Sequence, residues 1–519
     1  MTDMEGKLQR LNDVLRGHLT PCAENDPGSC ATALLDQDIC PQPPRHSDAS
    51  PPLVTGLEEP QNDDAAVNGM AMVFLEEHTS VYYGESSNIN FTQLLLRAVA
   101  SARNSAIEIP GAKGHTGSLN DGNVSSIHRS QSQSNPPEST SSKTSMTSLP
   151  EVAEMSRLLD MYFNTCGVVF PFISEDATRR IYAEYLENGF KSTRRTWLGN
   201  VNMIFALATM LDRENFPSAK KRFERGDLYY RRAVGLCGEP SKHVISLETV
   251  HYLLMVVIYC QGTQRSAQAW NTHGLLTRSA MALGLHSPDA GGDLDPAQAE
   301  VRRRTWVVIY CLDKVLSATF GRPASIPDEQ AVDWGSSAKF RQNSSSTEAE
   351  ADIPGDFLAV SFQLYQVMSK SLAKQYSTTG GRKDNDLDDL NTVQASVEFR
   401  KTLRTWASSL PPYIGLCDAG SEILAENTRV NRLRVILSLR YHNLSILVLR
   451  PFLSITIVNL FQEGVVNHPP YFYQLAMAEA EECIKSAEAT IDISYAVITA
   501  DSTSKNNLGA WYFTLYYGE

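Results

Sequence analysis

Apolar residues recur every three or four positions through most of the chain after residue 150. This spacing is typical of amphipathic helices, because it gathers the apolar side chains on one face of a 3.6-residue turn. Residues 246–262 begin with a serine that suits a helix cap and become apolar on nearly every face, which predicts a central helix buried on all sides. No alternating strand pattern precedes a helix, so a βαβ fold is not expected. The pattern predicts an all-α protein built as a multi-helix bundle.

Capping and breaking residues indicate where these helices begin and end. Ser148, followed three residues later by Glu151, fits a capping box at the start of the helical part. Gly284 and Gly321 occupy positions where helices usually stop. Pro451 interrupts an apolar helical pattern in the C-terminal third, and we expect the helix to end there.

The first 150 residues differ in composition from the rest. Met4, Leu8, Leu11 and Leu15 follow a 4-3-4 spacing, which makes them a dimerisation candidate, although a frayed surface helix explains the spacing equally well. The Pro-, Asp- and Ser-rich stretches that follow cannot bury enough apolar surface to offset chain entropy, so we expect disorder there. We predict a coil at 1–19, disorder at 20–68, a short ordered element at 69–101, a Ser-rich, phosphorylatable linker at 102–149, a core at 150–335, a loop at 336–352 and C-terminal helices of the same body at 353–519.

Composition narrows the classes of function. The net charge of the 519-residue chain is −13, which argues against a whole-surface polyanion binder, because phosphate affinity depends on Lys and Arg. No segment is apolar for the roughly 20 residues that cross a bilayer, and residues 1–10 lack the apolar region of a secretory signal, so we expect a soluble intracellular protein without a membrane partner. No two of the nine cysteines are separated by two residues, so no C-x-x-C metal site is expected.

The sequence gives little support for catalysis. It contains no G-x-G-x-x-G, P-loop, H-E-x-x-H or G-x-S-x-G motif. His243, His251, His273 and His286 come closest to a cluster, but such dispersed histidines are more often satisfied core or surface groups. Basic runs at 220–225 and 302–304 are interrupted by acidic residues, which favours solvated helix faces and ion pairs over a nucleic-acid surface.

Three stretches resemble the fungal-specific transcription factor domain, the middle homology region of zinc binuclear cluster regulators. They are the helix pair SLETVHYLLMVVIYCQGTQRSAQAWNTHGLLTRSAMALGLH, the segment EVRRRTWVVIYCLDKVLSATFGRPASIPDE, and MYFNTCGVVFPFIS before them. A short Tyr-Gly-x-Ser-Ser element at 80–91 is similar to one that precedes this domain in the family. The residues that we single out as a structural or regulatory motif are Trp270, Gly274, Arg278, Arg304, Trp306, Asp313, Gly321, Arg322 and Pro323.

Asp313 is the charged member of this motif that most needs explanation. It shares a face of an otherwise apolar helix with Trp306 and Ser317, and an unpaired buried carboxylate would cost several kcal/mol. Arg322 is our candidate partner, because the Gly-Arg-Pro turn folds the chain back onto the helix end. Arg278, on the adjacent helix, is the second candidate. An ion pair that locks the bundle explains these residues better than a ligand contact.

The sequence departs from the family at its DNA-binding element. The six-cysteine zinc cluster of the family is absent, so zinc is implied only for a full-length form, and we expect no cofactor in this chain. The final residues resemble part of a family helix. Both edges therefore suggest an incomplete gene model or a natural truncation.

By resemblance, the chain is the regulatory body of a nuclear fungal transcription factor and not an enzyme. The implied partners are DNA through the absent cluster, a homo- or heterodimer partner, the transcription machinery and a small-molecule effector. One alternative is a cluster-less protein that dimerises with full-length relatives and modulates them. A more remote alternative is an all-α enzyme or scaffold.

Overall fold

The computed structural model describes residues 82–105, 148–238, 245–263, 265–287, 290, 294–330, 352–376, 386–426, 428–461 and 470–500. The chain divides into the units Met1–Glu77 and His78–Glu519, and every described residue belongs to the second. The described residues form helices and no strands, so the predicted all-α class is confirmed. No helix in this part of the chain is long and apolar enough to span a membrane.

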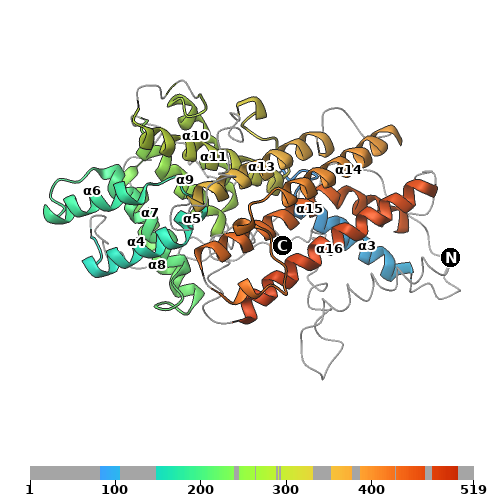
Figure 1. Cartoon of the computed structure of the whole chain (residues 1–519), viewed down its shortest axis with the longest axis horizontal. Coiled ribbons are helices and arrows are strands. Elements are labelled where there is room, and N and C mark those ends of the chain that lie inside the picture. Colours follow the sequence, from blue (N-terminus) through green and yellow to red (C-terminus); the bar gives the residue numbers. More distant parts are fainter. Residues whose placement is uncertain are drawn as a thin grey trace, which may run out of the picture. The chain divides into compact units, whose positions relative to one another are not determined.

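The elements follow one another in this order (Figure 1): α3 (Asn88–Ser105), α4 (Val152–Asn164), α5 (Cys166–Val169), α6 (Glu175–Glu187), α7 (Arg195–Leu211), α8 (Ala219–Cys237), α9 (Leu247–Gly262), α10 (Ser266–Ala282), α11 (Pro296–Phe320), the short η3 (Asp328–Gln330), α13 (Ile353–Gln375), α14 (Asp386–Ser408), η5 (Pro412–Ile414), η6 (Glu422–Ala425), α15 (Arg429–Phe461) and α16 (Pro470–Ala500). The predicted coil at 1–19, the stretch at 20–68 and most of the loop at 336–352 lie outside the described residues.

The core is centred on helices that are apolar on all sides. Every residue of α9 from Thr249 to Gln261 is buried, which confirms the predicted central helix. Helix α7 packs against α8 and α9, and α9 packs against α10. Helix α11 contacts α9, α10 and α13, while α13 also contacts α14 and α15. The contact of α11 with α13 therefore joins the earlier helices to the later ones, and the segment that follows α11 lies beside this junction.

The capping predictions hold in part. Gly321 ends α11 as predicted, in the left-handed region at a φ of 64°. At the start of α9, the Ser246 hydroxyl accepts an amide hydrogen of the first turn. The predicted capping box at Ser148 is wrong. Helix α4 has Glu151 as its N-cap residue, with no side-chain capping bond. Ser148 lies before the helix, so its hydroxyl does not occupy the capping position.

The predicted helix end at Pro451 is also wrong, because α15 continues through this residue. Proline has no N–H for the carbonyl four residues earlier, which belongs to Leu447. The Tyr376 hydroxyl donates to this carbonyl at 2.6 Å, and Gln375 Nε2 donates to the next one, of Val448, at 2.9 Å. These two tertiary hydrogen bonds come from the end of α13. They satisfy carbonyls at the point where a proline weakens the helix.

Candidate functional site

The Gly-Arg-Pro motif forms a loop of residues 321–327 between α11 and η3. The loop is held from two directions within the described part of the chain. One contact is made by residues 82–87, which precede α3 and which we call the strap. The other is a buried polar cluster around Asp313, on the last turns of α11. Together the strap contact and the polar cluster make up the candidate site.

The strap places its backbone directly on the turn. The Gly84 amide donates to the Phe320 carbonyl at 3.0 Å, and the Ser86 hydroxyl donates to the Ala318 carbonyl at 3.3 Å. A Cβ on Gly84 would clash with the Gly321 carbonyl oxygen, and a Cβ on Gly321 would clash with the Gly84 backbone. Glycine is therefore required at both positions, because any side chain would separate the two backbones.

Arg322 binds the strap and not Asp313, so the predicted pair is wrong. Its Nε donates to the Tyr82 carbonyl at 3.1 Å. Its guanidinium lies 4.8 Å from the ring centre of Trp270 and 5.0 Å from that of Phe320, within cation–π range. The strap residue comes from 240 positions earlier in the chain. The adjacent sequence therefore could not reveal the partner.

The strap is fastened a second time, by α15. Arg450 Nη1 donates to the Ser86 carbonyl at 2.9 Å, and Nη2 donates to Asn88 Oδ1 at 2.9 Å. The guanidinium lies 4.9 Å from the ring centre of Phe91. Two arginines that lie far apart in the sequence, Arg322 and Arg450, therefore hold one short backbone segment.

Asp313 is bound by backbone amides of the loop. It is 1% exposed, and its Oδ1 and Oδ2 accept hydrogen bonds of 3.0 Å from the amides of Ser325 and Ile326, respectively. Hydrogen bonds to an ionised carboxylate are among the stronger kinds in proteins. Arg278, the second predicted partner, is exposed and makes no contact with Asp313 in the described structure, so that prediction is also wrong. The role of Asp313 is to fold the loop back along α11.

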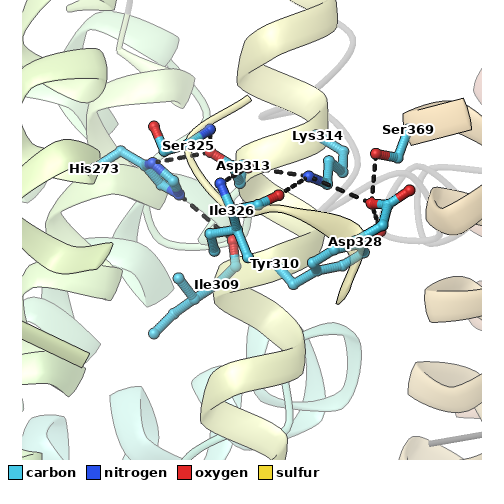
Figure 2. Close-up of polar contacts among 9 residues, drawn as sticks. All are labelled: His273, Ile309, Tyr310, Asp313, Lys314, Ser325, Ile326, Asp328 and Ser369. Atoms are coloured by element: carbon cyan, nitrogen blue, oxygen red, sulfur yellow. Dashed lines mark hydrogen bonds and ion pairs between the residues drawn. The ribbon is translucent and has the colours of Figure 1, made fainter. Parts of the chain in front are cut away.

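Lys314 extends the cluster toward α13 (Figure 2). Its Nζ lies 3.3 Å from Asp313 Oδ2 and 3.8 Å from Asp328 Oδ1, and it also donates to the Ile326 carbonyl. Asp328 Oδ1 accepts from the Tyr310 hydroxyl at 2.8 Å. The Ser369 hydroxyl of α13 donates to the same oxygen at 2.6 Å. The cluster thereby ties the loop to both helices at the junction.

His273 closes the cluster on the side of α10 (Figure 2). Its Nδ1 lies 3.8 Å from Asp313 Oδ1, and its Nε2 lies 3.4 Å from the Ile309 carbonyl oxygen. Because a carbonyl only accepts, Nε2 carries the hydrogen of the neutral ring. Burial lowers the pKa of His273, while the Asp313 charge opposes that shift. The ring is therefore neutral near pH 7 and fills the cluster without adding a charge.

The other predicted residues are spread over the same region. Arg304 donates to Glu300 and Asp352, and so links α11 to the N-cap of α13, while Trp306 Nε1 donates to the Gln330 carbonyl at 3.3 Å. Gly274 has open space around it, and Pro323 is exposed. The motif therefore comprises both loop-holding residues and residues outside the site.

Several residues of the site were missed at the level of sequence. His273 was noted among the dispersed histidines but interpreted as a satisfied core or surface group, and Lys314, Asp328 and Ser369 gave no recognisable motif. Arg450 did leave a signal, because it is a lone charge within the otherwise apolar run SILVLRPFL. A charged side chain in such a run is almost never fully buried without partners.

The described residues of the site form neither a metal-ligand group nor a reactive thiol arrangement. Within the described residues, no group of three His, Cys, Asp or Glu side chains could hold a metal ion. No two cysteines of the sequence are separated by two residues, so it contains no C-x-x-C ligand pair. Burial raises the pKa of the Cys311 thiol to about 12, so it stays protonated near neutral pH. The polar groups of the cluster instead form hydrogen bonds and ion pairs with one another.

Comparison with known proteins gives one consistent family. Residues 159–405 match the fungal specific transcription factor domain. The chain is 55% identical over 535 residues to Transcription factor FBD3 of Fusarium pseudograminearum, covering all of this chain and 70% of that protein. It is 54% identical over 529 residues to Transcription factor FBD3 of Gibberella moniliformis, again covering all of this chain and 70% of that protein.

More distant relatives match a smaller part. The ABC-transporter-regulating transcription factor of Aspergillus fumigatus is 24% identical over 279 residues, which cover 51% of this chain and 29% of that protein. No solved structure matches the chain. All nine predicted motif residues, from Trp270 to Pro323, lie inside the matched domain.

Proposed function

The chain belongs to the fungal-specific transcription factor domain family and is a transcriptional regulator, and from this premise we propose that its helical body controls transcription through the strap. In this proposal the core at 150–335 and the helices at 353–519 act as one body. The body restrains or releases the chain that precedes α3. It does so by binding the strap at the Gly-Arg-Pro turn and at α15.

The observation that supports this proposal is that two arginines, one after α11 and one on α15, bind the strap. Arg322 and Arg450 bind backbone carbonyls of residues that lie 240 and 364 positions earlier. Neither arginine has a carboxylate partner among the described residues, so both depend on the strap for their hydrogen bonds. A change in the packing of α11 or α15 would therefore alter the hold on the strap.

A reporter assay tests the role of the strap. The full chain is fused to an unrelated DNA-binding domain in a fungal host, and transcription is measured for wild type, Arg322→Ala and Arg450→Met. We expect both variants to change reporter output in the same direction at equal protein level. Arg278→Ala, which removes an exposed arginine of the same motif, should behave as wild type. Output equal to wild type in both strap variants would contradict the proposal.

We further propose that the protein acts in the nucleus and does not work as an enzyme. DNA recognition would belong to a longer form with a six-cysteine zinc cluster, and Met4, Leu8, Leu11 and Leu15 would support pairing with a second chain. Light scattering of wild type and of Leu8→Asp with Leu11→Asp tests the pairing. A gel-shift assay tests DNA recognition, and tight, sequence-specific DNA binding by this chain alone would contradict our assignment.

A further inference from the structure

Helix α15 carries three buried arginines, and one of them is poorly satisfied. Arg432 donates to the Asn164 carbonyl, and Arg450 binds the strap. Arg440 is 8% exposed, and its only hydrogen bond within the described structure is from Nη1 to the Ser361 hydroxyl at 3.0 Å. Its Nε is fully buried without a hydrogen bond, as are the Nε atoms of Arg432 and Arg450, so Arg440 is distinguished by its single hydrogen bond. Arg400, by contrast, pairs its partly buried guanidinium with the Glu479 carboxylate at 2.9 Å.

The surroundings of Arg440 do not neutralise its charge. The guanidinium lies 5.1 Å from the ring centre of Phe357 and 5.6 Å from that of Tyr365, so two aromatic faces contribute cation–π attraction. An arginine cannot lose its proton in a protein. An unpaired buried charge is costly unless something of opposite sign joins it.

Arg440 lines an internal cavity of about 20 Å³ where α5, α9, α11, α13 and α15 meet. The polar side chains of the lining are Gln261, Cys311, Ser361, Tyr365 and Arg440, and the remainder are apolar. Neither the Gln261 amide nor the Tyr365 hydroxyl has a hydrogen-bond partner among the residues that the structure describes. Unpaired donors and one cation therefore face a single apolar-walled space.

We propose that this cavity binds a short aliphatic carboxylate, with Arg440 as its counter-ion. One guanidinium balances one negative charge, which favours a monocarboxylate over a phosphate dianion. The planar fork of arginine matches two carboxylate oxygens, while the Tyr365 hydroxyl and the Gln261 amide supply further donors. The apolar walls suit the aliphatic chain, as in most small-molecule sites.

Binding would change the packing of the helices. A cavity of about 20 Å³ holds little more than one water. The structure is therefore the closed form of the site, and the carboxylate stabilises a form in which the helices around Arg440 lie further apart. A ligand that prefers one packing shifts the population toward it. This inference rests on the proposed regulatory function and names its effector class.

Thermal melts of the purified full chain test the site. Sodium butyrate is compared with sodium chloride at equal concentration and with the neutral butyramide. We expect a saturable rise in melting temperature with butyrate alone. Arg440→Met should weaken the apparent affinity by about a hundredfold, as when one partner of a buried charge pair is removed. Arg404→Met, which removes an exposed arginine outside the cavity, should leave the butyrate response intact.

A second variant keeps the Arg440 charge and reduces the volume of the cavity. Val315→Leu adds one carbon to the cavity wall and should also weaken the butyrate response in a folded protein. Equal stabilisation by butyrate and chloride, or by butyrate and butyramide, would overturn the proposal. So would a butyrate response that is unchanged in both Arg440→Met and Val315→Leu. The thermal melt measures binding independently of transcription. Butyrate binding without any effect on reporter output would therefore contradict the regulatory role and leave the binding site intact.

Discussion

Lys314 and Arg440 are both buried cations near the junction of α11 and α13, but their surroundings differ. Lys314 is 1% exposed and has two carboxylates and a carbonyl around its Nζ. Arg440 has one hydroxyl and two aromatic rings. A buried charge with partners of opposite sign contributes to a fixed local structure. A buried charge without such a partner raises the free energy of the folded state, and a ligand of opposite charge can remove this cost. The difference separates the part of the interior that holds the loop from the part that we assign to binding.

The largest loss of stability should come from removing a carboxylate partner of Lys314. Asp313→Ala leaves Lys314 buried with less negative charge and frees the amides of Ser325 and Ile326. We expect the free energy of unfolding to fall by about 3–5 kcal/mol, as when one member of a buried pair is lost. Urea unfolding measures it. Asp295→Ala, an exposed helix cap, is the control and should cost about 1 kcal/mol. Similar losses in the two variants would contradict the comparison.

A buried histidine differs from the two buried cations, because it can lose its proton and become neutral, whereas an arginine cannot. His251 Nε2 lies 3.0 Å from the Thr305 hydroxyl, and burial lowers the pKa of His251 from 6.5 to about 4. The unfolded chain therefore binds more protons, and stability is complete above pH 6.5 and is lost as pH falls toward 4. This shift amounts to about 3 kcal/mol.

Unfolding measured across this pH range tests the contribution of His251. His251→Gln should flatten the dependence, since glutamine keeps an N–H for Thr305 and does not titrate. The variant should therefore lose less stability than wild type between pH 6.5 and 4. Identical pH profiles for wild type and variant would show that His251 is not the titrating group.

The strap gives a smaller effect, because it holds the loop from outside. Gly84→Ala forces a methyl group against the Gly321 backbone, and we expect a loss of about 1–3 kcal/mol, the usual cost of overpacking. Gly274→Ala is the matched control, because its methyl group would enter open space within α10. It should stabilise the protein by up to about 1 kcal/mol through helix propensity. A harmless Gly84→Ala would mean that the strap does not need this close approach.

The smallest change in stability is expected at Arg440, the buried charge without a carboxylate partner. Arg440→Met removes a cation without a carboxylate partner and keeps much of its volume, so the free energy of unfolding should change by less than about 1 kcal/mol. The same denaturant titrations measure it. A loss as large as that of Asp313→Ala would remove the distinction between the two buried cations.

The helices and the motif could be predicted from the sequence, but the partners within the motif could not. Local periodicity identified the buried α9, and Gly321 marked the end of α11, because both depend on neighbouring residues alone. Asp313 was correctly expected to need a partner. A side-chain cation was expected, whereas the actual partners are mainly backbone amides, which every loop possesses and no pattern reveals.

Long-range contacts explain the remaining errors. Arg322 binds a carbonyl 240 residues away, and the helix around Pro451 is completed by side chains of α13. Arg440 and Arg450 interrupt apolar runs of the sequence, and that interruption is the one local sign of an interior role. What each arginine binds depends on packing between distant helices, which a single sequence does not encode in any local spacing.

The distance between the strap and Arg450 also fixes an order of events during synthesis. Arg450 follows its strap partner Ser86 by 364 residues. At about 5–20 residues per second, the strap leaves the ribosome roughly 20–70 seconds before its anchor on α15 is made. The contact of the strap with Arg450 is therefore among the last tertiary contacts to form. Until residues 318–322 are made, the Tyr-Gly-x-Ser-Ser peptide has neither the contacts with the Gly-Arg-Pro turn nor the contact with Arg450, and it is accessible to chaperones and modifying enzymes that encounter the nascent chain.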